Sequence, residues 1–119
     1  MDEKTLKDRT KQFSLKIIKL VSSLPKTLAA QVIGRQLVKS GTSVGANYRS
    51  ACRARSKAEF TAKLGIVEEE ADESAFWMEI IIESGLLKGD RSIRLLLKEA
   101  NELVAIMVAS RKTVKKRSG

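Results

Sequence analysis

Histidine is absent from this 119-residue chain, and cysteine occurs once, at Cys52. Without histidine the chain has no Ser-His or Cys-His nucleophile pair, no imidazole-ligated metal, and no Glu-x-x-His ligands of the kind that hold di-iron centres in helical bundles. A single cysteine excludes an internal disulfide and any metal site built from several thiolates. One proline and seven glycines argue against a loop-rich or all-β chain. We therefore expect a non-enzymatic protein without a cofactor or metal.

Long apolar runs are also missing. Residues 1–12 are mostly polar and charged, unlike a signal peptide, and the most apolar segment, 75–87, is interrupted by Glu79 and Glu83. A membrane-spanning helix needs about 20 apolar residues. Apolar residues still make up 43 % of the chain, which is ordinary for a folded domain. We expect one domain over residues 1–119, in the cytoplasm, with a reduced thiol and no membrane contact.

Apolar residues recur every three or four positions along nearly the whole chain, and this spacing predicts helices. The expected helices span about 4–23, 26–54, 57–84 and 91–112, followed by a basic frayed tail at 113–119. Pro25 suits the first turn of the second helix, and Gly41 allows a kink or break within it. Ser56 and Glu59 form a capping-box pattern before the third helix, and Gly85 suits its end. The predicted fold is all-α, an antiparallel up-down-up-down four-helix bundle.

The expected third helix carries more apolar side chains than one buried stripe needs. Between residues 75 and 82 they cover nearly its full circumference. A bundle helix buries one face, so the remaining apolar side chains must contact something else. That contact is either wider packing within the chain or a subunit interface. We expect a homo-oligomer whose interface contains Phe76, Trp77, Ile80 and Ile81.

An acidic run at 68–73 has two interpretations. Glu69 shares a helix face with Asp72 and Glu73, so a hard-cation site or a general acid/base pair is conceivable. Most of the run lies off the apolar stripe, and we expect instead a solvated or interface-lining acidic face that pairs with Lys or Arg.

A polar ladder borders the apolar stripe of the second helix, at spacings of four, three and four: Gln36, Ser40, Ser43 and Asn47. Its members either line a small-molecule site or let helices approach closely and fix their register. We expect the structural role, with partly buried groups that need hydrogen-bond partners.

The charge of the chain is strongly positive, because 23 Lys and Arg against 14 Asp and Glu give a net charge of +9. Basic residues gather near the N-terminus, around the turn after the second helix, and in the tail. In an antiparallel bundle these groups converge at one end. Such an end either binds phosphates of RNA or DNA with little sequence selectivity or only keeps the protein soluble. We expect nucleic-acid contacts at a set of eight residues, named here the basic rim: Arg49, Arg53, Arg55, Lys57, Lys112, Lys115, Lys116 and Arg117.

Three stretches of the chain resemble the signatures of a known family. They are 36–48 (QLVKSGTSVGANY), 53–60 (RARSKAEF) and 66–74 (IVEEEADES). These residues are similar to those of the four helix bundle family, also called the 23S ribosomal RNA intervening sequence protein family, and the likeness covers about residues 10–110. Ser50 departs from the pattern, since many members carry glutamate there.

The resemblance implies a small antiparallel bundle that assembles into a ring-shaped homopentamer with a central channel. Some members are encoded within inserts in bacterial large-subunit ribosomal RNA genes. A distantly similar bundle, the accessory protein of diversity-generating retroelements, is a basic pentamer that binds nucleic acid and reverse transcriptase. The family brings no catalytic residues. We expect a non-enzymatic homo-oligomer that binds RNA or DNA as an accessory or scaffold protein. The alternative is an adaptor that binds an unidentified protein partner and no nucleic acid.

Overall fold

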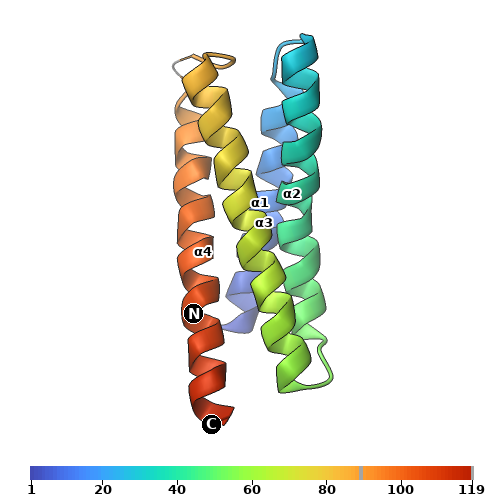
Figure 1. The fold of residues 1–119 in the computed structure, drawn as a ribbon, viewed down its shortest axis with the longest axis vertical. Coiled ribbons are helices and arrows are strands. Elements are labelled where there is room, and N and C mark those ends of the chain that lie inside the picture. Colours follow the sequence, from blue (N-terminus) through green and yellow to red (C-terminus); the bar gives the residue numbers. More distant parts are fainter. Residues whose placement is uncertain (89, 119) are drawn as a thin grey trace.

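The computed structural model describes residues 1–88 and 90–118, except for the side chains of Arg117 and Ser118. This part of the chain contains no strand and forms four helices: α1 (Glu3–Ser22), α2 (Leu28–Cys52), α3 (Lys57–Ser84) and α4 (Arg91–Ser118). In Figure 1 the chain runs up α1, down α2, up α3 and down α4. Consecutive helices pack along their lengths, and a less extensive α1–α4 contact closes the bundle. The predicted all-α four-helix bundle is confirmed.

Capping residues explain where three of the helices begin and where α3 ends. Asp2, Thr27 and Ser56 each accept a hydrogen bond from the backbone N–H three residues on, which satisfies a donor that the first turn leaves free. Gly85 ends α3 in the left-handed region, with φ of 80°, which glycine adopts without strain. The predicted bounds of the third helix are confirmed, and so are Ser56 as its N-cap and Gly85 as its end. The other half of the capping box differs, because Glu59 accepts from the Arg55 backbone N–H rather than from that of Ser56.

Two predicted boundaries are wrong. Thr27 caps α2, so the helix begins at Leu28 and Pro25 stays in the connection rather than in the first turn. The tail predicted to fray from residue 113 is helical through Ser118. Residues 111–118 contain no glycine or proline, and Lys and Arg are good helix formers, so nothing in this stretch stops α4.

Gly41 and Gly45 allow α1 and α2 to approach closely, and α2 runs through both without the break that Gly41 would allow. The Ser14 hydroxyl donates to the Gly41 carbonyl at 2.8 Å and accepts from the Gly45 N–H at 3.1 Å. A Cβ atom at Gly41 would lie 2.6 Å from Cγ2 of Ile17. These glycines therefore serve helix packing.

The core is a continuous apolar column to which all four helices contribute. Its largest fully buried side chains include Phe13, Ile17, Leu37, Leu64, Met78, Ile81, Ile93, Leu103 and Met107. One polar pair lies among them: the Ser40 and Ser74 hydroxyls hydrogen-bond at 2.9 Å between α2 and α3. Ser40 thus has the structural role expected of the polar ladder, whereas Gln36 is exposed.

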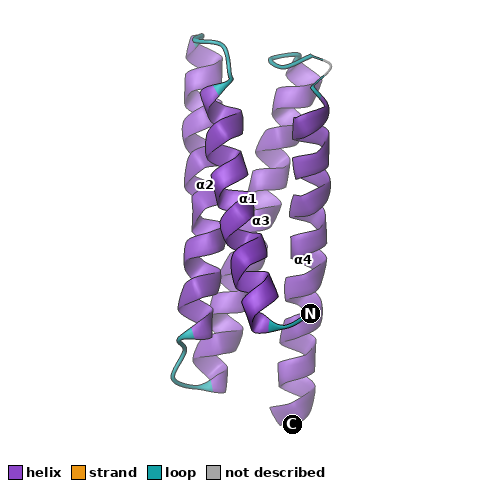
Figure 2. Cartoon of the chain, turned by 180° about the vertical axis from the view of Figure 1, so that it is seen from behind, coloured by secondary structure: helices purple, strands orange, loops and turns teal. Residues whose placement is uncertain are grey.

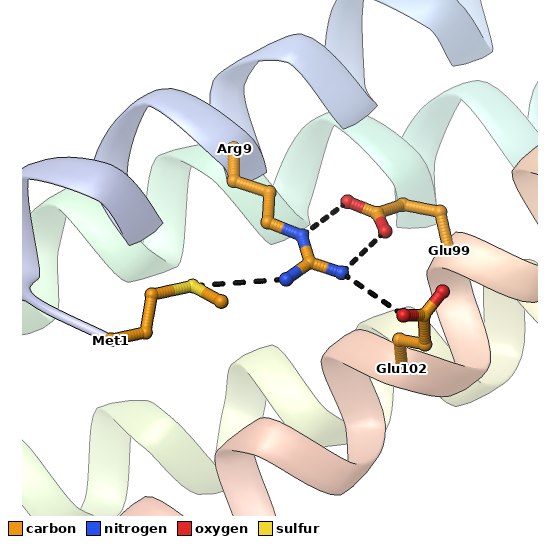
Figure 3. A network of polar contacts seen from close by, with 4 residues as sticks. All are labelled: Met1, Arg9, Glu99 and Glu102. Atoms are coloured by element: carbon orange, nitrogen blue, oxygen red, sulfur yellow. Dashed lines mark hydrogen bonds and ion pairs between the residues drawn. The ribbon is translucent and has the colours of Figure 1, made fainter.

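An ion pair joins α1 to α4 (Figure 3). Arg9 donates from Nε and Nη2 to the two carboxylate oxygens of Glu99, each at 2.6 Å, and Nη2 also lies 3.6 Å from Glu102. The Glu99 carboxylate raises the pKa of Arg9. Bidentate geometry of this kind fixes the two partners more firmly than a single contact does.

Candidate nucleic-acid interface

One end of the bundle brings together the start of α1, the α2–α3 connection and the end of α4 (Figures 1 and 2). This follows from the alternating direction of the helices. The three basic groups of the sequence therefore approach the same end, as the antiparallel arrangement predicts. The opposite end holds the α1–α2 and α3–α4 connections.

Half of the basic rim lies in the α2–α3 connection and in the helix ends beside it. Arg49 lies in the last turn of α2, Arg53 is its C-cap, Arg55 lies in the connection, and Lys57 is the first residue of α3. All four side chains are exposed. Glu59, the nearest acidic residue in sequence, accepts a hydrogen bond from the Arg55 backbone N–H at 3.4 Å. No ion pair in the described part of the chain engages any of the four.

The C-terminal half of the rim is carried on helix α4. Lys112, Lys115 and Lys116 are exposed on its last turns. Arg117 is helical, but its side chain lies outside the described residues. Arg111, just before them, is paired with Glu68 of α3. That contact confirms the expected pairing of the acidic run with a basic residue, and it removes Arg111 from the unpaired positive charge.

Lys7 and Lys11 complete the positive surface and were not among the predicted contacts. They lie on α1 beside Arg49 and Arg53, along a groove between α1 and α2. Their spacing of four residues places them on one helix face, which is visible in the sequence. The sequence did not reveal which helix that face adjoins.

The predicted subunit interface is only partly at the surface. Phe76 is 51 % exposed and meets Trp77 edge-on, with ring centroids 5.0 Å apart. Trp77 and Ile80 are half-buried. Ile81 is 0 % exposed and belongs to the core, so its prediction as an interface residue is wrong. Adjacent isoleucines look alike in sequence, and only the rotation of α3 decides which one faces inward.

The described residues contain no group of three or more His, Cys, Asp or Glu side chains able to hold a metal ion. Burial raises the pKa of the Cys52 thiol, and nearby Glu3 adds to the shift. A thiol with a raised pKa is a poor nucleophile at neutral pH. Within the same residues, no helix is long and apolar enough to cross a membrane.

Comparisons with known proteins agree with the four-helix fold. The family model described as 23S rRNA-intervening sequence protein matches residues 3–109. A crystal structure from Bacteroides thetaiotaomicron VPI-5482, described as a protein with unknown function from the S23 ribosomal protein family, superposes with a TM-score of 0.85 at 29 % identity. The match covers 94 % of this chain and 99 % of that one. No curated protein matches the chain. With its fold and nearly all of its length matched, the chain belongs to the 23S rRNA-intervening sequence protein family.

Proposed function

We propose that this protein is a non-enzymatic scaffold that forms a homo-oligomer and binds the phosphate backbone of RNA or DNA through the basic rim. The observation that carries the proposal is the gathering of exposed, unpaired cations at one end of a chain with a net charge of +9. Phosphate contacts by Lys and Arg supply most sequence-independent affinity for nucleic acid. The names of the family and of the similar structure, which refer to ribosomal RNA and a ribosomal protein, are consistent with such a ligand.

Apolar surface supports the oligomeric part of the proposal. Phe76 on α3 and both Leu28 and Val32 on α2 are among the exposed large apolar side chains. Ser40 contacts Ser74 and the two helices are antiparallel, so the start of α2 lies beside the half of α3 that holds Phe76. Exposed apolar surface of this kind favours a protein contact. The family resemblance makes five subunits the expected number.

Assembly through this half of the bundle would repeat the basic rim once per subunit. The apolar surface lies toward one end of α3, and the α2–α3 connection lies at the other. Subunits related by a rotation axis that runs along the bundles would therefore present their rims on the same side of a ring. Repetition converts weak contacts of single rims into stronger binding of one long polyanion.

The test is a salt titration with two matched variants. The first replaces the rim residues of the α2–α3 connection with alanine: Arg49, Arg53, Arg55 and Lys57. The second removes four exposed cations from the opposite half of the bundle: Lys26, Arg35, Arg91 and Arg94. Fluorescence anisotropy with duplex DNA and duplex RNA gives the affinity at each salt concentration.

The rim variant should bind more weakly and with a flatter salt dependence, by about 0.9 log units per decade for each lost phosphate contact on DNA. The loss should be similar across unrelated sequences, because phosphate contacts carry no base information. The control variant should stay close to wild type. An equal loss in both variants would show that net charge alone governs binding. Absence of binding by the wild type would favour the adaptor function.

A further inference from the structure

The groove between α1 and α2 is a strongly positive hollow on the surface of the molecule. It has a volume of about 420 Å³ and is lined by Lys7 and Lys11 from α1 and by Arg49 and Arg53 from α2. No carboxylate lines it. Glu3 and Asp8 line a neighbouring opening that shares Lys7 and Lys11 with the groove. Two helices thus present four cations to one hollow.

These four cations are free to bind a ligand. Each side chain is exposed, and no ion pair within the described residues engages any of them. Like charges that line one hollow with no carboxylate among them raise the local positive potential, and a concave surface concentrates that potential. An anion in the groove would relieve the repulsion among them.

The neutral groups of the groove restrict what the ligand can be. The Ser14 hydroxyl is engaged with the Gly41 carbonyl and the Gly45 N–H, and the Thr42 hydroxyl donates to the Val38 carbonyl at 2.6 Å. Both hydroxyls therefore donate their protons to backbone carbonyls of α2, so neither has a proton left to donate to a base edge. No aromatic side chain lines the groove, so it offers no platform on which a single-stranded base could stack. The lining suits phosphates rather than bases.

We propose that the α1–α2 groove seats the phosphodiester backbone of a nucleic acid, with Lys7 and Lys11 as contacts beside Arg49 and Arg53. The inference rests on the proposed function and deepens it, because it assigns the contact to one groove and adds two residues of α1. Gly45 lies at the groove and has no side chain to fill it. Binding through this groove is independent of sequence and does not prefer single strands to duplexes.

The test compares two double variants of α1 with the same change in charge. One is Lys7→Gln/Lys11→Gln, and the control is Lys16→Gln/Lys19→Gln, whose exposed lysines line a hollow between α1 and α4 instead. Lysine and glutamine have similar helix propensities, so both variants should fold, and circular dichroism checks this. The probe is a labelled DNA duplex of about 20 base pairs. Its affinity is measured between about 50 and 200 mM salt, the range in which affinity from phosphate contacts changes strongly.

The groove variant should lose at least about tenfold in affinity at the lowest salt, and its salt slope should fall by about 1.8, while the control stays near wild type. Equal losses in the two variants would overturn the assignment of the contact to the groove, and so would an unchanged affinity of the groove variant when the wild type binds. Neither result would contradict binding through the basic rim. A wild type that binds neither duplex DNA nor duplex RNA would overturn the proposed function itself.

Discussion

Gly41 and Gly65 are both interior helical glycines, but their surroundings differ. An added Cβ at Gly41 would lie within 3 Å of three Ile17 atoms, whereas at Gly65 its nearest neighbour would be Arg111 Cδ at 4.0 Å. We expect Gly41→Ala to destabilise the protein by about 1–3 kcal/mol through overpacking, despite the better helix propensity of alanine. Gly65→Ala should be neutral or stabilise by up to about 1 kcal/mol. Urea unfolding measures both, and equal effects would contradict the close approach of α1 and α2.

Tyr48 and Cys52 make the free energy of unfolding depend on pH in the alkaline range. Burial raises the pKa of the Tyr48 phenol, and burial also raises the pKa of the Cys52 thiol. Both groups therefore stabilise the folded state fully below their unfolded pKa values, about 10 and 8.5, and this stability is lost as pH rises beyond them. We expect the free energy of unfolding to be lower at pH 10.5 than at pH 8. Tyr48→Phe should lessen that fall, and an identical fall in the variant would contradict the assignment.

At the level of helices, the Arg9–Glu99 pair should contribute more than the Arg9–Glu102 contact. Glu99 binds Arg9 through two oxygens and is 25 % exposed, whereas Glu102 lies 3.6 Å from Arg9 and is 52 % exposed. Glu99→Gln should cost about 1–2 kcal/mol, and the isosteric Glu102→Gln less than about 0.5 kcal/mol. Urea unfolding again gives the values. A larger cost for Glu102→Gln would contradict the geometry at the α1–α4 contact.

Helix ends were predictable from sequence where a cap marks them. Ser56 and Gly85 place both ends of α3 correctly, because each satisfies backbone groups that the helix leaves unpaired. The end of α4 carries no such signal, and its high charge suggested fraying although the residues are good helix formers. Ile81 was misassigned for a related reason. In a helix that is apolar almost all round, spacing does not identify the inward face, which depends on packing against α2 and α4.

For the whole molecule, two substitutions in α3 distinguish an effect on assembly from an effect on folding. Phe76→Asp changes an exposed side chain and should dissociate the oligomer with its helical circular dichroism intact. Ile81→Asp places a charge in the core and should unfold the chain, because an unpaired buried charge is costly. Light scattering should give about five times the chain mass of 13.2 kDa for the wild type. A monomeric wild type at micromolar concentration would contradict the oligomer.

The position of the candidate site was predictable, but its shape was not. The alternating direction of the helices brings the basic groups to one end, independently of how their side chains are oriented. Connectivity alone therefore predicts the basic rim. The α1–α2 groove depends on how α1 is rotated about its axis and on how closely Gly41 and Gly45 let it approach α2. From sequence alone these glycines only lower the helix propensity of α2. Their importance arises from a contact with Ser14, which precedes Gly41 by 27 positions and Gly45 by 31.

The most direct test of the account is the salt dependence with which the wild-type protein binds duplex DNA. With four groove cations neutralising phosphates, the logarithm of the affinity should fall linearly with the logarithm of salt concentration, with a slope of about −3.6 or steeper. The slope should be the same for unrelated sequences. No binding at about 50 mM salt, or an affinity that salt does not change, would contradict the claim that the basic end of this protein holds nucleic acid.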